Sequence, residues 1–209
     1  MRTFTASELA ELNKRYRTNF INSLSGFKSL QLLGTISLEG KSNLAIFNSI
    51  FHIGANPPQL GLVVRPDGPE HDTLNNIRET GYYTLNNVQE SYYRQAHQTS
   101  ARYPSGQSEF EACGLMPVFI EDFSVPFVSN ASVRIGLKLK EILAVNNGTH
   151  IVIGEVELVQ LNEKCLSADG FADLAAAGSI TIAGLDTYYR TEKIARLAYA
   201  KPDEETKEL

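Results

Sequence analysis

A long stretch of alternating side chains near the end of the chain limits the fold more than any other feature of the sequence. Its apolar positions are Val133, Ile135, Leu137 and Leu139, and basic residues stand between several of them. An Asn-Asn-Gly turn follows at 146–148, and "IVIGEVELVQL" then repeats the alternation. A period of two on both sides of an Asn-Gly turn is typical of a β-hairpin. The sequence therefore predicts a long antiparallel hairpin.

Several shorter stretches indicate further strands. The run "SLQLLGTISLEGKSNLAIFNSIFHI" has two β-rich arms around "LEGK", which predicts a second hairpin. An apolar strand, "QLGLVV", follows Pro57-Pro58, "YYTLNNV" reads as another strand, and "GLDTYYR" reads as a loop or short strand. Seven or eight closely connected strands make a mainly β fold, and they favour a β-barrel with peripheral helices.

Helical spacing is confined to short segments. We expect one or two helices over about 6–25 with Ser7 as the N-cap, and a helix that begins near Asp72 and ends at Gly81. A further short helix is expected in "TEKIARLAY". Residues 89–114 form a polar, irregular insertion with short helical pieces, and 201–209 form a charged tail. No repeat or linker divides the chain, so we predict a single domain over 1–209.

Composition excludes several classes of function. The net charge is −5 with scattered basic residues, which disfavours nucleic acid as a partner. No run approaches the roughly 20 apolar residues of a membrane span, and no apolar signal segment begins the chain. Cys113 and Cys165 are far apart and form no CxxC pair. We expect a cytoplasmic protein that does not bind a membrane.

Motifs for catalysis and metal binding are missing from the sequence. There is no phosphate-binding GxxxxGK[ST], no GxGxxG, no GxSxG and no HExxH. The histidines do not cluster at ligand spacing; they are His52, His71, His97 and His150. We therefore predict neither a metal site nor a catalytic side chain.

One segment combines features of an anion site. Arg65 comes directly after an apolar strand, and a helix begins near Asp72 and Thr73. A helix N-terminus and a guanidinium both suit phosphate, and the hydroxyls of Ser42, Ser49 or Thr73 could complete such a site. The alternative is that Arg65 is a surface residue paired with Glu70 and Thr73 is only a cap.

The strand around residues 43–51 carries unusually many polar residues. Simple alternation places Leu44, Ile46, Asn48 and Ile50 on one face and Asn43, Ala45, Phe47, Ser49 and Phe51 on the other. Small residues beside aromatic ones would let a flat ring lie along this strand. The alternative is a core strand whose polar groups bond to neighbouring backbone.

Taken together, the motifs resemble the flavin-reductase-like family of the FMN-binding split barrel. The resemblance rests on the order of "SNLAIFNSIFHIGANPPQLGLVVRP", "HDTLNNIRETGYYTLNNV", "SEFEACGL", the long hairpin and "GLDTYY", and it covers about residues 25–195. It implies a six-stranded antiparallel, Greek-key-like split barrel with helices around it. It also implies a homodimer with FMN near the subunit interface.

The resemblance also implies a cofactor site. The residues beside the isoalloxazine and ribityl chain would be Ser42, Asn43, Leu44, Ala45, Asn48 and Ser49. Those near the phosphate would be Arg65, His71, Asp72 and Thr73. Tyr188 or Tyr189 would approach the flavin from the late loop.

The implied activity is that of an NAD(P)H-dependent flavin reductase. NADH or NADPH would donate a hydride to flavin N5, with FMN or alternatively FAD as the flavin. The reduced flavin would pass electrons to oxygen, free flavin or a partner oxygenase. The insertion is longer than in many short flavin reductases, and its Arg94 and Arg102 would either meet a nicotinamide phosphate or be solvated.

Three other functions remain open from the sequence. The chain could be a flavin-binding electron carrier without NAD(P)H activity, or a split-barrel oxidase of a small substrate. It could also be a β-barrel interaction protein without cofactor. A colourless protein that binds no flavin would favour the last of these.

Overall fold

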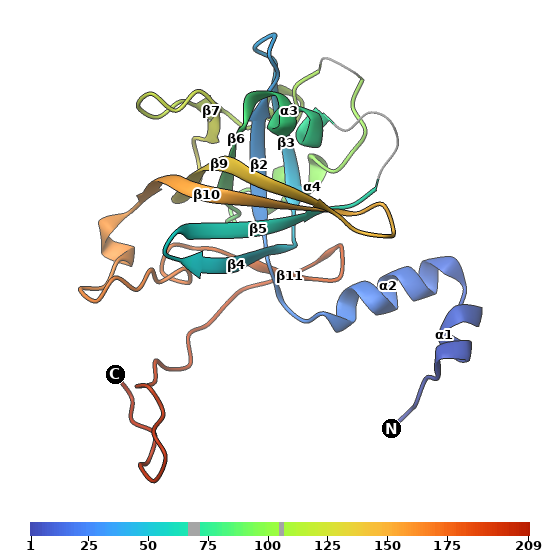
Figure 1. Ribbon diagram of the computed structural model, residues 1–209, viewed down its shortest axis with the longest axis vertical. Helices are drawn as coiled ribbons and strands as arrows, with labels where there is room; N and C mark the ends of the chain where they lie inside the picture. The colour runs from blue at the N-terminus through green and yellow to red at the C-terminus, as the bar shows by residue number, and fades with distance from the viewer. Residues whose placement is uncertain (67–71, 105–106) are drawn as a thin grey trace.

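Most of the chain's strands form one curled antiparallel sheet. The computed structural model describes residues 1–66, 72–104 and 107–209 (Figure 1). The strands of this sheet are β2 (Gln31–Ile36), β3 (Ser42–Phe47), β4 (Ile50–Ala55), β5 (Pro58–Val64), β6 (Tyr82–Asn87), β9 (Val133–Ala144) and β10 (His150–Leu161). Their order across the sheet is β3-β2-β6-β9-β10-β5-β4.

The two edge strands of this sheet are consecutive in the sequence. Only Asn48 and Ser49 separate β3 from β4, although β3 pairs with β2 and β4 pairs with β5. The Val63 N–H donates to the Ser49 carbonyl at 3.0 Å, so pairing with β5 begins at this junction. The sheet therefore closes into a barrel of six strands, one of which is interrupted, and the predicted split-barrel fold is confirmed.

The predicted long hairpin is formed by β9 and β10. Val145 and Thr149 close its turn with an N–H to carbonyl bond of 2.8 Å, and Gly148 has a φ of +84°. Glycine adopts this left-handed conformation without steric cost. The hairpin's inward residues include Leu137 and Val152, both fully buried.

The barrel interior holds one apolar cluster. Its buried members are Leu33, Leu62, Val64, Leu74, Ile77, Tyr83, Leu85, Leu137 and Val152. Full burial of such a side chain stabilises the fold by about 1.5–3 kcal/mol. Two members come from α3 (Asp72–Thr80), which packs on the barrel. This helix is where the sequence predicted it, and Gly81 (φ +75°) ends it with an N–H to Ile77 bond of 3.0 Å.

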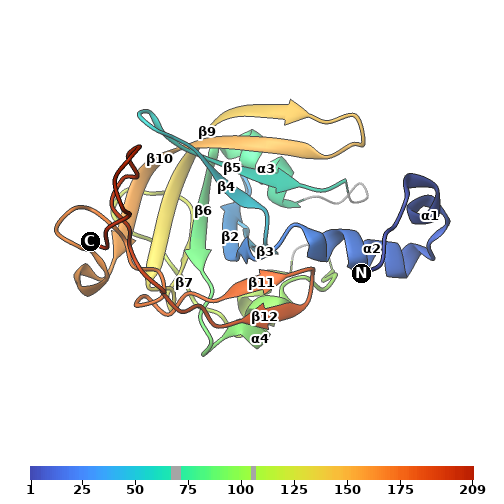
Figure 2. The same cartoon turned by 90° about the horizontal axis from the view of Figure 1, so that it is seen from below.

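A second apolar cluster lies outside the barrel, against β2 and β3. It joins Leu32 and Leu44 to Val88, Phe110 and Ile182. The elements around the barrel are β1 (Lys28–Ser29), α4 (Tyr93–Gln98), α5 (Glu109–Ala112), β7 (Pro117–Val118), β8 (Phe127–Val128), η1 (Glu163–Cys165), β11 (Thr181–Ala183) and β12 (Thr187–Tyr189). Strands β1, β11 and β12 form a small sheet of their own, which Figure 2 shows beside α4.

The N-terminal helices extend away from the body (Figure 1). They are α1 (Ala6–Glu11) and α2 (Lys14–Leu24), as the sequence predicted. The expected N-cap was wrong by two residues. Thr5, not Ser7, caps α1 in a capping box, because its hydroxyl accepts from the Glu8 N–H and Glu8 accepts from the Thr5 N–H.

The C-terminal helix expected in "TEKIARLAY" is wrong. Residues 190–196 have no regular secondary structure, and Ile194 is fully exposed. Lys193 pairs with Asp173 at 2.6 Å, and Arg196 pairs with Asp169 at 2.5 Å while its guanidinium lies over Phe171. These contacts hold the segment along the preceding loop, whereas so short a helix with no apolar partner would gain little from folding.

Two further features bear on the compositional expectations. Cys113 and Cys165 are both buried and are not bonded to each other. Within the described residues, no helix is long and apolar enough to cross a membrane.

Candidate functional site

Strand β3 presents an open hydrogen-bonding edge. Within the described chain, β3 pairs with β2 on one side only. On the other side the Leu44 N–H donates to the carboxylate of Glu109 at 3.0 Å. Because backbone groups in an antiparallel strand alternate in direction, the N–H and C=O of Ile46 face the same open edge. An edge of this kind is a template for pairing with another molecule.

One end of this edge is a network of polar side chains around Asn43, which is only 9% exposed. Its amide lies 3.0 Å from the Thr73 hydroxyl and 3.3 Å from that of Thr35. With the amide turned over, its nitrogen donates to Glu109 at 3.3 Å and its oxygen accepts from both hydroxyls. We prefer the turned orientation, because a carboxylate only accepts. Asn43 therefore connects β3 to α3 and to Glu109.

Glu109 makes this end of β3 acidic. Burial raises the pKa of its carboxyl, the Leu44 N–H opposes that rise, and the nearby charge of Asp72 adds to it. Two carboxylates therefore lie near the start of α3. Their charge makes this end less suited to a phosphate than the helix N-terminus alone would suggest.

The other end of the edge is the junction between β3 and β4. The Asn48 amide donates to the Gly184 carbonyl at 3.0 Å, which ties the junction to the turn between β11 and β12. The Ser49 hydroxyl lies 3.3 Å from the Asn48 side-chain oxygen. Both residues are half-buried, so their polar groups border on solvent at a break in the barrel wall.

Two basic residues lie on segments that run to this junction: Lys28 on β1, which contacts β4, and Arg65 directly after β5, which pairs with β4. Burial lowers the pKa of Lys28, and the positive charge of Arg65 lowers it further. Among the described residues neither has a carboxylate partner within 4.0 Å; the suggested partner Glu70 lies outside them. A pair of unneutralised cations at a strand end suits an anion.

Lys28 and Glu109 were not predicted from the sequence as site residues. Lys28 reaches the junction through the pairing of β1 with β11, which joins segments about 150 residues apart. Glu109 reaches β3 from the insertion. No local spacing signals either contact, and only the tertiary fold reveals them.

Several predicted site residues are distributed differently from the expectation. Leu44 is fully buried in the outer cluster, so only its backbone borders the edge. Ser42 and Ala45 are half-buried, and Asp72 is exposed. Thr73 contacts Asn43, whereas Arg65 directly follows β5. His71 falls outside the described residues.

The expected continuous alternation over 43–51 is wrong beyond Phe47. Leu44 and Ile46 belong to the outer cluster, but Ile50 packs with Phe47 against the barrel interior. The strand breaks at Asn48 and Ser49 and changes partner there, which shifts the inward-facing positions by one residue.

Tyr188 lies on β12 and packs against the outer cluster. Its hydroxyl is 2.6 Å from His97 Nδ1, and its ring lies 5.3 Å from that of Tyr93. Burial and, less strongly, the charge of Asp186 raise the pKa of Tyr188 to about 12. Its hydroxyl is therefore neutral at physiological pH and is held by the insertion helix α4.

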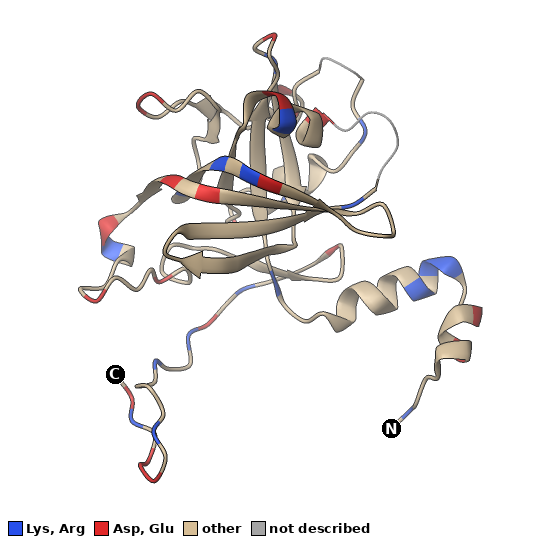
Figure 3. Ribbon diagram, viewed as in Figure 1, with Lys and Arg blue, Asp and Glu red and all other residues tan. Residues whose placement is uncertain are grey.

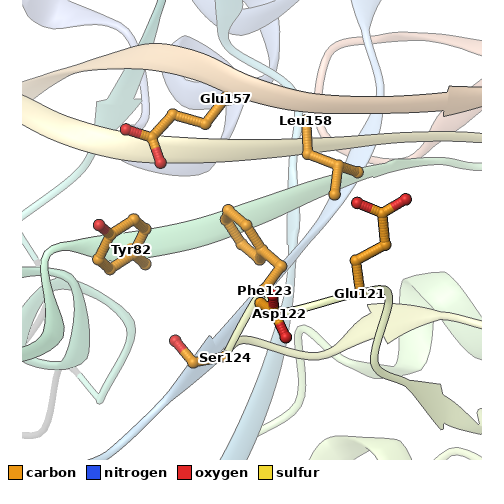
Figure 4. Close-up of a pocket in the computed structure, with 7 residues that line it drawn as sticks. All are labelled: Tyr82, Glu121, Asp122, Phe123, Ser124, Glu157 and Leu158. Atoms are coloured by element: carbon orange, nitrogen blue, oxygen red, sulfur yellow. The ribbon is translucent and has the colours of Figure 1, made fainter.

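A separate cavity lies on another part of the barrel (Figure 4). Its volume is about 350 Å³, and its lining residues are Tyr82, Glu121, Asp122, Phe123, Ser124, Glu157 and Leu158. None of the predicted site residues lines it. In the part of the chain that the structure describes, no three His, Cys, Asp or Glu side chains are grouped to hold a metal ion.

Comparison with known families identifies the class of protein. Residues 28–175 match the model of the flavin reductase like domain. This match covers most of the chain and contains β3, β4, β5 and the long hairpin. The chain belongs to this family, as the order of its motifs predicted.

Individual relatives agree with this assignment. A crystal structure from Shewanella frigidimarina NCIMB 400, assigned as a flavin reductase with split barrel domain, is 47% identical. It covers 96% of this chain and 100% of that chain, with a TM-score of 0.92. Nitrilotriacetate monooxygenase component B from Bacillus cereus is 23% identical over 92% of this chain and 96% of its own, with a TM-score of 0.80, and shares the fold. The uncharacterised Bacillus subtilis protein YwrF is 28% identical over 68% of this chain and 72% of its own.

Proposed function

We propose that this chain binds FMN along the open edge of β3 and acts as an NAD(P)H-dependent flavin reductase. The observation that carries the proposal is the free backbone edge at Ile46, flanked by Asn43 at one end and by Lys28 and Arg65 at the other. The six residues of β3 span roughly 20 Å, so one extended ligand can meet both ends.

The residues present fit the chemistry of FMN. The backbone groups of Ile46 and the amide of Asn48 suit the polar atoms of the pyrimidine ring and ribityl chain. Ser42, Ala45 and Ser49 leave room beside the strand because their side chains are small. Lys28 and Arg65 supply the positive charge that a phosphate requires, whereas Asp72 and Thr73 lie at the other end of the edge, near Glu109 and Asn43.

When bound, FMN supplies the redox chemistry, as a hydride acceptor at N5 for NADH or NADPH. The side chains of this site need only bind and orient the two molecules and keep water away. Tyr188, held by His97, would cover the flavin from β12 as a neutral hydroxyl. FAD is an alternative flavin.

We also propose the setting in which this site works. The chain is a single FMN-binding domain that forms a homodimer in the cytoplasm and supplies reduced flavin to an acceptor. An acceptor oxygenase is supported by the similarity in fold to a monooxygenase component.

The first experiment is a visible absorption titration of the purified protein with FMN, FAD and riboflavin. The proposal predicts a perturbed flavin spectrum that saturates at one FMN per chain, with weaker binding of riboflavin because it lacks the phosphate. Anaerobic addition of NADH or NADPH should then bleach the flavin absorption.

The outcomes of this titration separate the rival functions. A bound flavin that neither nucleotide bleaches would retain the site but replace the reductase by an electron carrier or an oxidase. A protein that leaves the spectra of all three flavins unchanged would overturn the proposed site and favour an interaction protein without cofactor.

A further inference from the structure

The separate cavity beside β6 and the long hairpin has an apolar floor that is fixed by its neighbours. A Cβ on Gly136 would lie 2.8 Å from the Phe123 ring and 3.2 Å from the Cβ of Leu158, so the missing side chain of Gly136 makes room for that ring. Phe123 also packs against the fully buried Phe127, with ring centroids 5.4 Å apart. The floor is therefore formed before any ligand binds, as in most small-molecule sites.

Tyr82 forms one wall of this cavity and already attracts a cation. Its ring meets that of Phe123 edge-on, with centroids 5.6 Å apart and planes at 88°. The ammonium of Lys138 lies over the Tyr82 ring, 5.7 Å from its centroid. An aromatic face attracts a cation electrostatically through its quadrupole. The aromatic walls therefore favour a ligand that carries positive charge beside an apolar body.

Three carboxylates border the cavity, those of Glu121, Asp122 and Glu157. Glu121 and Asp122 belong to the loop after β7, which is red in Figure 3 and contains no Lys or Arg. Among the described residues, neither of the two lies within 4.0 Å of a basic group, and Lys138 alone pairs with a lining carboxylate. Three carboxylates therefore face one ammonium, which leaves an excess of two negative charges.

The hairpin carries two comparable ion pairs, and the one at the cavity is the looser. Lys140 pairs with Glu155 at 3.1 Å, and neither residue lines the cavity. Lys138 lies 3.9 Å from Glu157, because the same ammonium is shared with the Tyr82 ring. Lys138 therefore neutralises Glu157 only in part. An ammonium ion that is not tethered to β9 can approach both groups more closely.

The arrangement of the carboxylates favours an organic cation over a metal ion. Within the described parts of the chain, no three His, Cys, Asp or Glu side chains are grouped to hold a metal. Figure 4 shows Phe123 between Tyr82 and Glu121, with Glu157 and Leu158 on the strand across from it. The negative charges therefore lie around an apolar floor. A matching ligand is elongated, with an apolar middle and a positive charge at each end.

We propose that this cavity binds an aliphatic diamine, a small organic dication. The hydrocarbon chain lies on Phe123 and Leu158, one ammonium group meets Glu157 beside Tyr82, and the other meets the acidic loop at 121–122. The volume of about 350 Å³ is in the range of about 300–1,000 Å³ that small-molecule pockets have. No residue of the proposed flavin site lines the cavity, so this inference does not depend on the proposed function.

The test is isothermal titration calorimetry of the full chain with three probes of equal chain length. Cadaverine is a five-carbon diamine, pentylamine has one of its two ammonium groups, and pentanol has none. Cadaverine should bind at one molecule per chain. Pentylamine should bind about 3–10-fold more weakly, because one ammonium–carboxylate contact is lost, and pentanol should give no saturable heat.

Two matched pairs of variants on the hairpin separate the cavity from the net charge of the protein. Glu157→Gln should raise the Kd for cadaverine about 3–5-fold, whereas Glu155→Gln, with the same change of charge on the same strand, should leave it unchanged. Lys138→Ala removes the competing ammonium and should lower the Kd about 2–3-fold, whereas Lys140→Ala should not.

The acidic loop is tested by replacing both of its carboxylates at once. Glu121→Gln together with Asp122→Asn should raise the Kd for cadaverine about 10-fold, because two ion contacts are lost. Both side chains are exposed, so the thermal unfolding of this double variant should match that of the wild type. Pentanol again serves as the uncharged probe, since it should remain unbound in every variant.

Four results would overturn this inference. They are a wild type without saturable cadaverine binding, equal affinities for cadaverine and pentylamine, equal effects of E157Q and E155Q, and weaker binding in K138A. A protein that binds cadaverine as predicted but binds no flavin would support this site and refute the proposed function instead.

Discussion

The two halves of one polar stretch, β3 and β4, have similar compositions and opposite environments. In β3, Asn43 and Leu44 are buried, and helices α3 and α5 pack beside the strand. In β4, Phe51, His52 and Ile53 are exposed in succession. The break at Asn48 and Ser49 makes this difference, because each half pairs with a different strand.

The comparison shows what each half can recognise. Strand β3 is covered on its faces and open at its edge, so it offers backbone groups with fixed direction. Strand β4 is paired at its edge with β5 and open on one face, so it offers an apolar surface. The first arrangement suits a small polar ligand, and the second suits another protein chain.

Truncation of one apolar residue in each half should give the largest contrast. Leu44→Ala removes a fully buried side chain and should lower the free energy of unfolding by about 2–5 kcal/mol. Phe51→Ala, at a position 41% exposed, should lower it by less than half as much. Chemical denaturation of both variants measures this, and equal losses would contradict the assigned environments.

Loss of either cation near the junction should weaken FMN binding at the β3 site. Arg65→Ala or Lys28→Ala should raise the Kd for FMN about 10–100-fold, since a charge-assisted hydrogen bond contributes about 1.5–3 kcal/mol. Riboflavin, which has no phosphate, should bind to the variants and to the wild type alike. Lys41→Ala, an exposed lysine already paired with Glu39, is the control. Equal weakening of both flavins would place the phosphate elsewhere.

Removal of the Tyr188 hydroxyl should have a smaller effect on stability, because it affects only the side of the molecule that contains β3. Tyr188→Phe breaks the hydrogen bond to His97 and should lower the free energy of unfolding by about 0.5–1.5 kcal/mol. The raised pKa of Tyr188 adds a pH dependence, because its contribution is present below about pH 10 and is lost as pH rises toward 12. The difference between wild type and Y188F in denaturation should shrink over that range.

The smallest effect on stability is expected when Glu109 is replaced. Burial raises the pKa of its carboxyl, so its contribution to stability is present at low pH and is lost as pH rises through that pKa. Glu109→Gln does not titrate and keeps an acceptor for the Leu44 N–H. The stability of this variant relative to wild type should therefore increase as pH rises through and above the ordinary titration range of a glutamate. A constant difference would show that Glu109 is solvated and does not cap the edge.

Local patterns predicted most of the fold. The hairpin of β9 and β10, the helix α3 ended by Gly81, and the strands after Pro58 all follow from spacing and turn residues. The C-terminal helix expected in "TEKIARLAY" is wrong, because ion pairs to the loop around 169–173 hold this segment in a non-helical conformation. Tertiary partners of this kind leave no local signal.

The candidate site was only partly accessible to sequence reasoning. Asn43, Asn48 and Thr73 became candidates because polar residues stand out in an apolar strand or at a helix start, and their binding role stays a prediction. Lys28 and Glu109 were missed, since they arrive from segments far away in the chain. The predicted orientation of the residues beyond Phe47 was also wrong, because alternation alone does not show where a strand breaks.

Amide hydrogen exchange of the full chain with and without saturating FMN tests the central claim most directly. The account predicts that FMN slows exchange in peptides covering Asn43–Ser49, above all at Ile46, and also near Lys28. Peptides around the separate cavity at Tyr82 and Phe123 should exchange at an unchanged rate. Bound FMN that protected the cavity and left β3 unaffected would contradict the assignment of the open edge as the flavin site.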